Sequence, residues 1–343
     1  MQTELIRLSG RPQHAWNARP TTVKQQPTLN VSVGARVSRS IFSRLPLLAA
    51  AIALGLSSAG AGEVPAAAKP APLPLHQIEG SGGIFSTLSA YIVNPPRNGE
   101  AAGRPSTGFA YVHLGDGRAL EAFTLTEVPW KRLELGYASD SLDLGDLPQA
   151  VERATGVRLR DHGVRLSVAS ARLQLLEEGN DTPAITLGVH YKTNDGVSRI
   201  NDDLGGALRS AGVEKSDGVD YTLYVSKLFK SLPAPLLVNA GVRSTQAAHV
   251  GLLGFTENRH QVFEGNAVLF LPGNFALAAE YRQKPDDYRP IGTLVKREAD
   301  WWTFDAAYVV DSHFTVAAGY GHFGDVLNHT ANAVWGLTFK YEF

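Results

Sequence analysis

The chain ends in GLTFKYEF, residues 336–343, and the spacing of the side chains in this stretch decides the fold. In an extended backbone Leu337, Phe339, Tyr341 and Phe343 lie on one face, because successive side chains of a strand point to opposite sides. A chain end is usually polar and frayed unless other parts of the protein hold it, so these four side chains need a protein core or a lipid bilayer around them. The rest of the sequence distinguishes these two environments.

The same alternation recurs along the chain from Ser106 onward. Stretches of roughly ten residues alternate apolar with polar or small side chains, and turn-rich segments separate them. About twelve such stretches are present: STGFAYVHL, ALEAFTLTE, KRLELGYAS, GVRLSVASARLQLL, PAITLGVHYK, VDYTLYVSKL, PLLVNAGVRS, HQVFEGNAVLFL, NFALAAEYRQ, DWWTFDAAYVV, HFTVAAGYGHF and AVWGLTFKYEF. In one of them Trp302, Phe304 and Tyr308 share a face that is opposite to Asp305.

The connections between these stretches show a second regularity. Counted back from the C-terminus they alternate between long and short: DVLNHTAN, VDSH, KPDDYRPIGTLVKREA, PGN, TQAAHVGLLGFTENR, SLPAP, NDGVSRINDDLGGALRSAGVEKSDG, EEGNDT, a long segment over residues 141–162, and VPW. Long external loops and short periplasmic turns are typical of outer-membrane proteins. The sequence therefore predicts an all-β fold, an antiparallel transmembrane β-barrel of about 12 strands, over residues 106–343. The first and last strands must pair, because an open edge in hydrocarbon would leave unpaired amides that cost several kcal/mol each.

Three local departures from regular strands are expected. In GVRLSVASARLQLL the alternation changes phase between Val168 and Ala169, which predicts a β-bulge. Two long loops carry helix signals. DLPQAVERATG offers Asp146 as N-cap residue and Gly156 as the stop, and DDLGGALRSAG runs similarly over residues 203–212.

The first 61 residues are interpreted as an N-terminal extension followed by a secretory signal peptide. Arg36, Arg39 and Arg44 precede an apolar run over residues 45–56, and small residues with an A-x-A pattern ending at Ala61 follow it. The apolar run, at about twelve residues, is shorter than the roughly 20 that a membrane-spanning helix needs. The expected localisation is the bacterial cell outer membrane, after cleavage near Ala61.

Composition excludes several kinds of chemistry. Cysteine is absent, so the chain has no disulfide, thiolate metal site or cysteine nucleophile. The first 61 residues carry seven Lys/Arg and one acid, so subtraction from totals of 32 and 33 leaves 25 bases against 32 acids in the remainder. This acidic balance argues against binding to nucleic acid.

Two segments separate the signal peptide from the predicted barrel. Residues 62–77 form an Ala/Pro-rich linker with no expected packed element. Residues 78–105 contain IEGSGG and a Pro95-Pro96 break. This glycine-rich segment either folds into the lumen as a plug or adds a strand, and the sequence leaves both placements open.

Several stretches also resemble a bacterial family known as domain of unknown function 3034. The resemblance lies in IEGSGG, LTEVPWKRLELGYASDSLDLGDL, LGVHYKTNDG, NDDLGGAL, DGVDYTLYVSKLF, GLLGFTENR, LAAEYRQKPDDY, DWWTFDAAYVV and VAAGYGHFGDVLNHTANAVWGLTFKYEF, and it covers most of residues 78–343. It implies an exported, outer-membrane-type β protein. It implies no reaction and no ligand residues.

If the apolar faces point to lipid, the opposite faces line the lumen. The predicted lumen residues, which are the candidates for solute contact, are Arg132, Glu134, Arg165, Arg172, His190, Lys192, Asp220, Arg243, Glu264, Glu280, Arg282 and Asp305. Charges of both signs in a narrow barrel either pair and block it or leave a polar path for a solute. Both interpretations are carried forward.

Two other kinds of site are weighed and set aside. Acids and amides over residues 194–203 supply oxygen ligands for calcium, but their spacing matches no calcium-binding loop. His162, Ser167 and Asp161 near one rim form the only candidate for a hydrolytic arrangement, and such a triple arises by chance in a barrel that contains several histidines. No catalytic residue, metal site or cofactor is predicted.

The sequence therefore predicts an outer-membrane channel or passive transporter for small solutes. The expected partners are outer-membrane lipid, an unidentified small solute and the barrel-assembly machinery, which reads a C-terminal strand of the kind that ends at Phe343. The alternatives are a non-conducting structural or surface-interaction barrel, a barrel hydrolase and a soluble periplasmic β protein.

Overall fold

A computed structural model describes residues 74–97 and 99–343. The predicted extension, the signal peptide and most of the predicted linker lie outside these residues. None of the described helices is long and apolar enough to cross a membrane.

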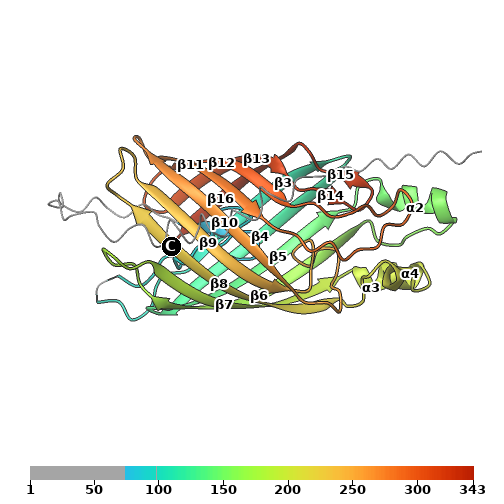
Figure 1. The fold of residues 1–343 in the computed structure, drawn as a ribbon, viewed down its shortest axis with the longest axis horizontal. Coiled ribbons are helices and arrows are strands. Elements are labelled where there is room, and N and C mark those ends of the chain that lie inside the picture. Colours follow the sequence, from blue (N-terminus) through green and yellow to red (C-terminus); the bar gives the residue numbers. More distant parts are fainter. Residues whose placement is uncertain (1–73, 98) are drawn as a thin grey trace, which may run out of the picture. The chain divides into compact units, whose positions relative to one another are not determined.

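Twelve strands form one closed antiparallel barrel (Figure 1). In chain order they are β3 (Ser106–Gly115), β4 (Arg118–Trp130), β5 (Leu133–Asp143), β6 (Gly163–Leu176), β7 (Ala184–Asp195), β8 (Asp217–Phe229), β9 (Leu236–Thr245), β10 (His260–Leu271), β11 (Phe275–Arg282), β12 (Trp301–Val309), β13 (Phe314–His322) and β16 (Val334–Glu342). Each strand pairs with its neighbours in sequence, and β16 pairs with β3 so that Phe339 lies opposite Phe109. All twelve predicted stretches are strands, and the predicted closure between the first and last strands is confirmed.

The two ends of the barrel differ in the length of their connections. At the end where β16 finishes, the strands are joined by short turns, such as residues 131–132 and 272–274. At the other end the connections are long, such as residues 196–216 and 283–300, with one exception, the tight turn at residues 116–117 between β3 and β4. Figure 1 shows the helices gathered at the end with the long loops. We call the half of the barrel next to the short turns the short-turn half, and the half next to the long loops the long-loop half.

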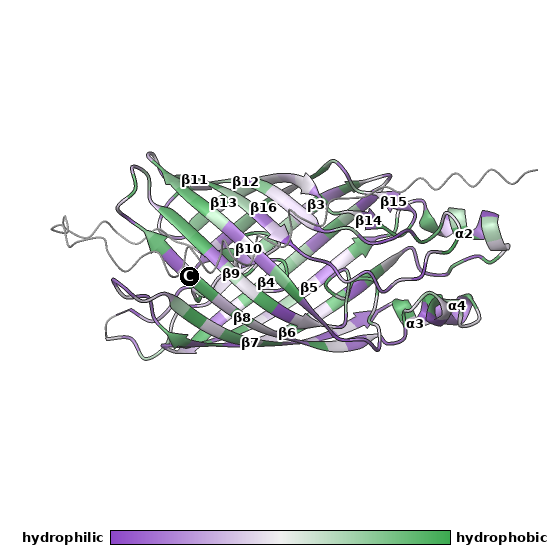
Figure 2. Cartoon of the chain, viewed as in Figure 1, coloured by the Kyte–Doolittle hydropathy of each residue, from purple (hydrophilic) through white to green (hydrophobic). Residues whose placement is uncertain are grey.

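The outer face of the short-turn half is apolar. Side chains such as Phe275, Leu277 and Leu173 point outward and are 47–50% exposed. Figure 2 shows such hydrophobic residues alternating with polar ones along the strands. A closed barrel with an apolar exterior is the architecture of outer-membrane proteins, since closure satisfies every backbone amide in the wall. The predicted fold, an antiparallel transmembrane β-barrel, is confirmed.

Helices occupy the long loops. They are α2 (Leu147–Thr155), α3 (Val197–Asp203) and α4 (Ala207–Ser210). The first agrees with the prediction, with Asp146 at the N-cap and Gly156 in the left-handed conformation at the C-cap, although the Asp146 side chain pairs with Arg118 and does not cap the helix. The helix predicted over residues 203–212 is found in part, as α4, because Gly205 and Gly206 adopt positive φ angles and separate α3 from α4.

The bulge predicted in β6 is wrong. Between Val168 and Ala169 the pairing of β6 with β5 runs without a break, and the only irregularity in β6 lies later, between Gln174 and Leu176 in the pairing with β7. Even-numbered side chains of β6 are buried from Val164 to Gln174. What changes along the strand is the polarity of the inner face, which is apolar at Leu166 and polar from Ser170 onward.

This apolar inner face belongs to a core that fills the long-loop half. Inward side chains such as Val112 and Leu166 pack in one cluster with loop residues such as Leu252 and Phe255. Phe255 is fully buried. The loops therefore fold back onto the mouth of the barrel and close it with an apolar core, which we call the loop core.

Candidate functional site in the barrel lumen

The N-terminal segment Pro74–Val93 lies inside the barrel, and we call it the plug segment. It contains two short strands, β1 (Leu75–Gln77) and β2 (Ser81–Gly83), which pair with each other and not with the wall. Nearly every residue of the segment is buried, and its polar groups contact inward-facing wall side chains. Of the two predicted placements, the structure shows the lumen. The linker prediction for residues 74–77 is wrong, because these residues are buried and begin the plug.

Glycine at two facing positions allows the plug to approach the wall closely. Gly80 has a φ of +75°, which suits glycine, and a Cβ built there would lie 2.4 Å from the carbonyl oxygen of Tyr137. A Cβ at Gly136 on β5 would lie 2.0 Å from the carbonyl oxygen of Gly80. Larger residues at either position would push the plug away from β5.

Ten of the twelve predicted lumen residues face inward and are buried. They are Glu134, Arg172, His190, Lys192, Asp220, Arg243, Glu264, Glu280, Arg282 and Asp305. Their burial shows that the lumen is filled at their level.

The other two predicted lumen residues, Arg132 and Arg165, are misplaced. Arg132 lies in the turn after β4, where its half-exposed side chain pairs with Glu177 at 3.0 Å. The alternation of the strand was extended too far into a turn. Arg165 lies on the outer surface of β6, where it lines a hollow of about 560 Å³ beside Glu121 and Arg199. It faces outward because the apolar face of β6 points inward in the long-loop half.

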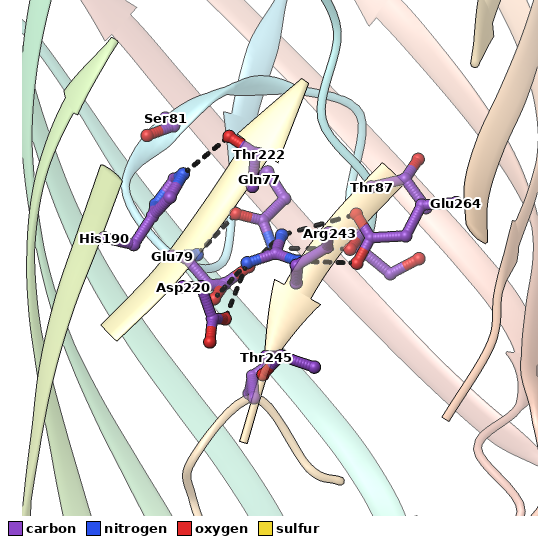
Figure 3. A network of polar contacts seen from close by, with 12 residues as sticks. Gln77, Glu79, Ser81, Thr87, His190, Asp220, Thr222, Arg243, Thr245 and Glu264 are labelled. Atoms are coloured by element: carbon purple, nitrogen blue, oxygen red, sulfur yellow. Dashed lines mark hydrogen bonds and ion pairs between the residues drawn. The ribbon is translucent and has the colours of Figure 1, made fainter. Parts of the chain in front are cut away.

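The centre of the lumen holds a buried ionic network around Glu79 of the plug (Figure 3). Arg243 Nη2 lies 2.8 Å from Glu79 Oε2, Lys192 forms an ion pair with the same carboxylate, and Arg282 Nη1 lies 3.4 Å from it. The cations also contact wall acids: Lys192 lies 2.6 Å from Asp220, and Arg243 lies 2.7 Å from Glu264. All six side chains are 0–3% exposed. Charges this deeply buried are tolerable only when paired and hydrogen-bonded, as they are here.

Two further wall carboxylates hold the backbone of the plug. Glu280 accepts hydrogen bonds from the backbone N–H groups of Phe85, Ser86 and Thr87 at 2.8–3.1 Å. Glu134 accepts one from the N–H of Gly82 at 3.1 Å and one from that of Val93 at 2.7 Å.

Wall cations also donate hydrogen bonds to the backbone of the plug. Arg172 pairs with Glu134 at 2.8 Å and donates to the carbonyl oxygen of Gly82 at 3.0 Å. Lys340 donates to the carbonyl oxygen of Pro74. The plug is therefore attached to the wall by polar contacts along its whole length.

A second buried ionic cluster lies in the long loops. His249 Nε2 lies 2.8 Å from Glu298 Oε1, and Lys284 pairs with the other oxygen of Glu298. Burial lowers the pKa of His249 below 6.5 even though Glu298 opposes this shift. Burial raises the pKa of Glu298, but His249 and Lys284 together hold it below 4.5. The cluster joins the loop before β10 to the loop before β12.

Sequence reasoning missed two acids in the lumen. Glu79 was missed because its position depends on the placement of the plug, which no local pattern indicates. Asp140 is fully buried on the inner face of β5, and both of its carboxylate oxygens lack a hydrogen-bond partner among the described residues. Counting in steps of two from Glu134 reaches Asp140, so the alternation contained this signal.

The residues considered for calcium and for hydrolysis have other contacts. Asp195 pairs with Arg199, Asp203 pairs with Arg160, and Asn194 donates to the carbonyl oxygens of residues 251 and 252. Within the described part of the chain, no group of three His, Asp or Glu side chains is arranged to hold a metal ion.

The hydrolase candidates do not form a unit. Asp161 pairs with Arg199 at 2.7 Å, while His162 is exposed at the rim. No hydrogen bond between His162, Ser167 and Asp161 is found among the described residues.

A comparison with protein families identifies the chain at the level of its family. The family model described as "Protein of unknown function (DUF3034)" matches residues 74–340. The chain belongs to this family. The match begins at the first residue of the plug segment, so the family unit includes the plug together with the barrel wall. No curated protein matches this chain.

Solved structures with some likeness are outer-membrane barrels. The KdgM porin is 10% identical, with a TM-score of 0.41, and the match covers 69% of this chain and 99% of the porin. The toluene transporter TodX of P. putida is 11% identical, with a TM-score of 0.39 and coverage of 80% and 99%. The outer membrane phospholipase of Salmonella typhi is 9% identical, with a TM-score of 0.35 and coverage of 72% and 94%. These weak likenesses concern architecture alone.

Proposed function

We propose that this protein is an outer-membrane channel for small solutes, and that the plug segment is its gate in the closed position. The observation that carries the proposal is the kind of attachment between the plug and the wall. The strands β1 and β2 pair only with each other, and the segment is held through side chains such as Glu280, Glu134 and Arg172.

Polar attachment supports a movable plug. A hydrogen bond to a charged group contributes only about 1.5–3 kcal/mol net, because water replaces the partner when the bond opens. Strand pairing with the wall would instead have to break as one cooperative unit. A plug held by side chains can therefore leave the lumen while the barrel stays closed as a cylinder.

An engineered disulfide tests the gate directly. Ser81 Oγ on the plug lies 3.0 Å from Ser170 Oγ on β6, a separation that a disulfide can bridge with small adjustments. The chain has no cysteine, so S81C/S170C forms the only possible pair. In planar bilayers, the oxidised variant should show no channel opening, and a reducing agent should restore the openings of the wild type.

The controls separate the gate from the channel. The single variant S81C should conduct equally with and without the reducing agent. If neither the wild type nor a variant lacking residues 74–93 gives conductance or solute flux, the channel proposal is wrong. If the oxidised tether conducts like the wild type, the channel stands and the gate does not.

The proposal includes a location and partners. The apolar exterior would contact outer-membrane lipid, and the strand that ends at Phe343 would be read by the barrel-assembly machinery. The work of the protein would be passive passage of a solute, with no catalytic step.

A second candidate function is a non-conducting structural barrel. It is favoured by the loop core, in which Leu166 of the wall, Phe255 of a loop and Phe85 of the plug join one apolar cluster. For a barrel of this kind, deletion of residues 74–93 would lower stability and leave the bilayer impermeable.

A further inference from the structure

The cationic side chains at the centre of the lumen are not balanced by the wall itself. Lys192, Arg243 and Arg282 carry three positive charges, and the wall acids in contact with them are Asp220 and Glu264. The third negative charge comes from Glu79 of the plug. If the plug moved, one of these three cations would remain without an acid in contact with it.

The other two wall cations that contact the plug do not show this imbalance. Arg172 is matched by Glu134 on the neighbouring strand, and Lys340 is matched by Glu342 two residues later. Asp140 forms no ion pair within 4.0 Å and no side-chain hydrogen bond among the described residues. Of these five wall cations, the group of Lys192, Arg243 and Arg282 therefore depends on Glu79 for its third negative charge.

The contacts of Glu79 describe the ligand that this place accepts. Both carboxylate oxygens are used: Arg243 approaches Oε1 at 3.1 Å and Oε2 at 2.8 Å, and the amide of Gln77 donates to Oε2 at 2.9 Å. Arginine matches a planar carboxylate with two parallel contacts, which a spherical anion cannot use. We infer that Lys192, Arg243 and Arg282 form a binding site for the carboxylate of a small organic acid, which Glu79 occupies while the channel is closed.

Beside this site the wall has an acid, Glu280, whose hydrogen-bond donors also come from the plug. Glu280 lies two residues before Arg282 on β11, about 7 Å along the strand, and both side chains point inward. The plug satisfies Glu280 with three backbone N–H groups and the hydroxyl of Thr87. A carboxylic acid with a hydroxyl or N–H donor about 7 Å from its carboxylate would replace both sets of plug contacts. Its carboxylate would take the place of Glu79, and its donor would bind Glu280.

The inference rests on the proposed channel for its biological meaning, but the site can be tested without conduction. The variant E79A removes the plug carboxylate and leaves a space of its size. Acetate should fill this space, because it restores the missing charge and the two oxygen contacts. In detergent, acetate should raise the melting temperature of folded E79A by about 3 °C or more relative to chloride at equal ionic strength. Refolding yield, read from heat-modifiable migration, should rise as well.

Two variants serve as matched controls. E79A/K192M leaves two cations facing two acids, so acetate should have no advantage over chloride. E79Q keeps the side-chain volume, so acetate should find no space. Equal melting temperature and refolding yield of E79A in acetate and chloride, including no folding in either, would overturn the site, and so would an equal acetate effect in E79A/K192M.

A bilayer measurement separates the site from the channel. Glycolate, a hydroxy acid, should raise the opening frequency of the wild type more than chloride does, by competing with Glu79. If acetate rescues E79A and no conductance is found, the binding site stands and the channel proposal is wrong. If the conductance is the same in carboxylates and in chloride, and acetate does not rescue E79A, the channel proposal stands and the binding site is wrong.

Discussion

The two halves of this barrel obey opposite rules. In the short-turn half Phe275 points outward and Ser226 points inward, as lipid outside and a polar lumen require. In the long-loop half Arg165 points outward and Leu166 points inward, as in a water-soluble protein. One continuous strand, β6, contains both arrangements without a bulge between them. The comparison shows that the solvent outside each half, and not the strand, decides which face is apolar.

The largest expected effect breaks the long-loop half. The substitution Leu166→Asp places a charge in the loop core, where apolar residues surround the side chain and Lys192 on the neighbouring strand is already paired with Glu79 and Asp220. An unpaired buried charge costs several kcal/mol, so the loops should fail to close and folding should be lost or severely reduced. Refolding in detergent, followed by heat-modifiable migration, measures this.

The neighbour Arg165 provides the control. Arg165→Gln changes a charge on the outer surface of the same strand and should leave the refolding yield unchanged. If both variants fold like the wild type, the inner face at Leu166 is not packed as described.

The next effect concerns the ionic network of the lumen. Arg243→Met leaves Glu79, Asp220 and Glu264 facing only two cations, and removal of one partner from a buried network costs about 3–5 kcal/mol. Arg132→Ala, in a half-exposed pair at the rim, should cost at most about 1 kcal/mol. Urea unfolding in lipid vesicles measures both, and similar losses for the two variants would contradict the placement of Arg243 in a closed network.

A smaller effect tests the lipid-facing surface. Phe304→Arg places a charge on the apolar outer face near the middle of β12 and should lower the free energy of unfolding in vesicles by about 2–4 kcal/mol. Thr193→Arg, on the exposed outer face of the long-loop half, should change it little. Equal effects would mean that both positions meet the same solvent, and the contrast between the halves would then be wrong.

Much of the fold could be predicted from the sequence, because the alternation of apolar and polar side chains is a local pattern that can be read along each strand. Ten lumen residues, including Glu280 and Arg282, followed from stepping along strands by two. Arg165 was misplaced because apolar faces were assumed to point outward everywhere, and the supposed bulge at Val168 came from the same assumption. Glu79 could not be predicted, because the position of a plug inside a barrel depends on contacts between residues far apart in sequence.

The smallest effect is expected from the pH dependence of loop closure in the long-loop half. Neutral His249 is favoured when the loops are closed, because its pKa is lowered below 6.5, so its contribution to closure is complete above pH 6.5 and is lost as the pH falls towards the lowered pKa. Glu298, with its pKa held below 4.5, contributes above pH 4.5 and loses that contribution as the pH falls further. Hydrogen exchange of residues 246–259, corrected for intrinsic rates, should therefore accelerate between pH 7 and pH 5, while exchange in the short-turn half stays constant. His249→Gln removes this imidazole and should show a smaller change. An equal change in this variant would assign the pH response to another group and leave His249 as a packing residue of the loop core.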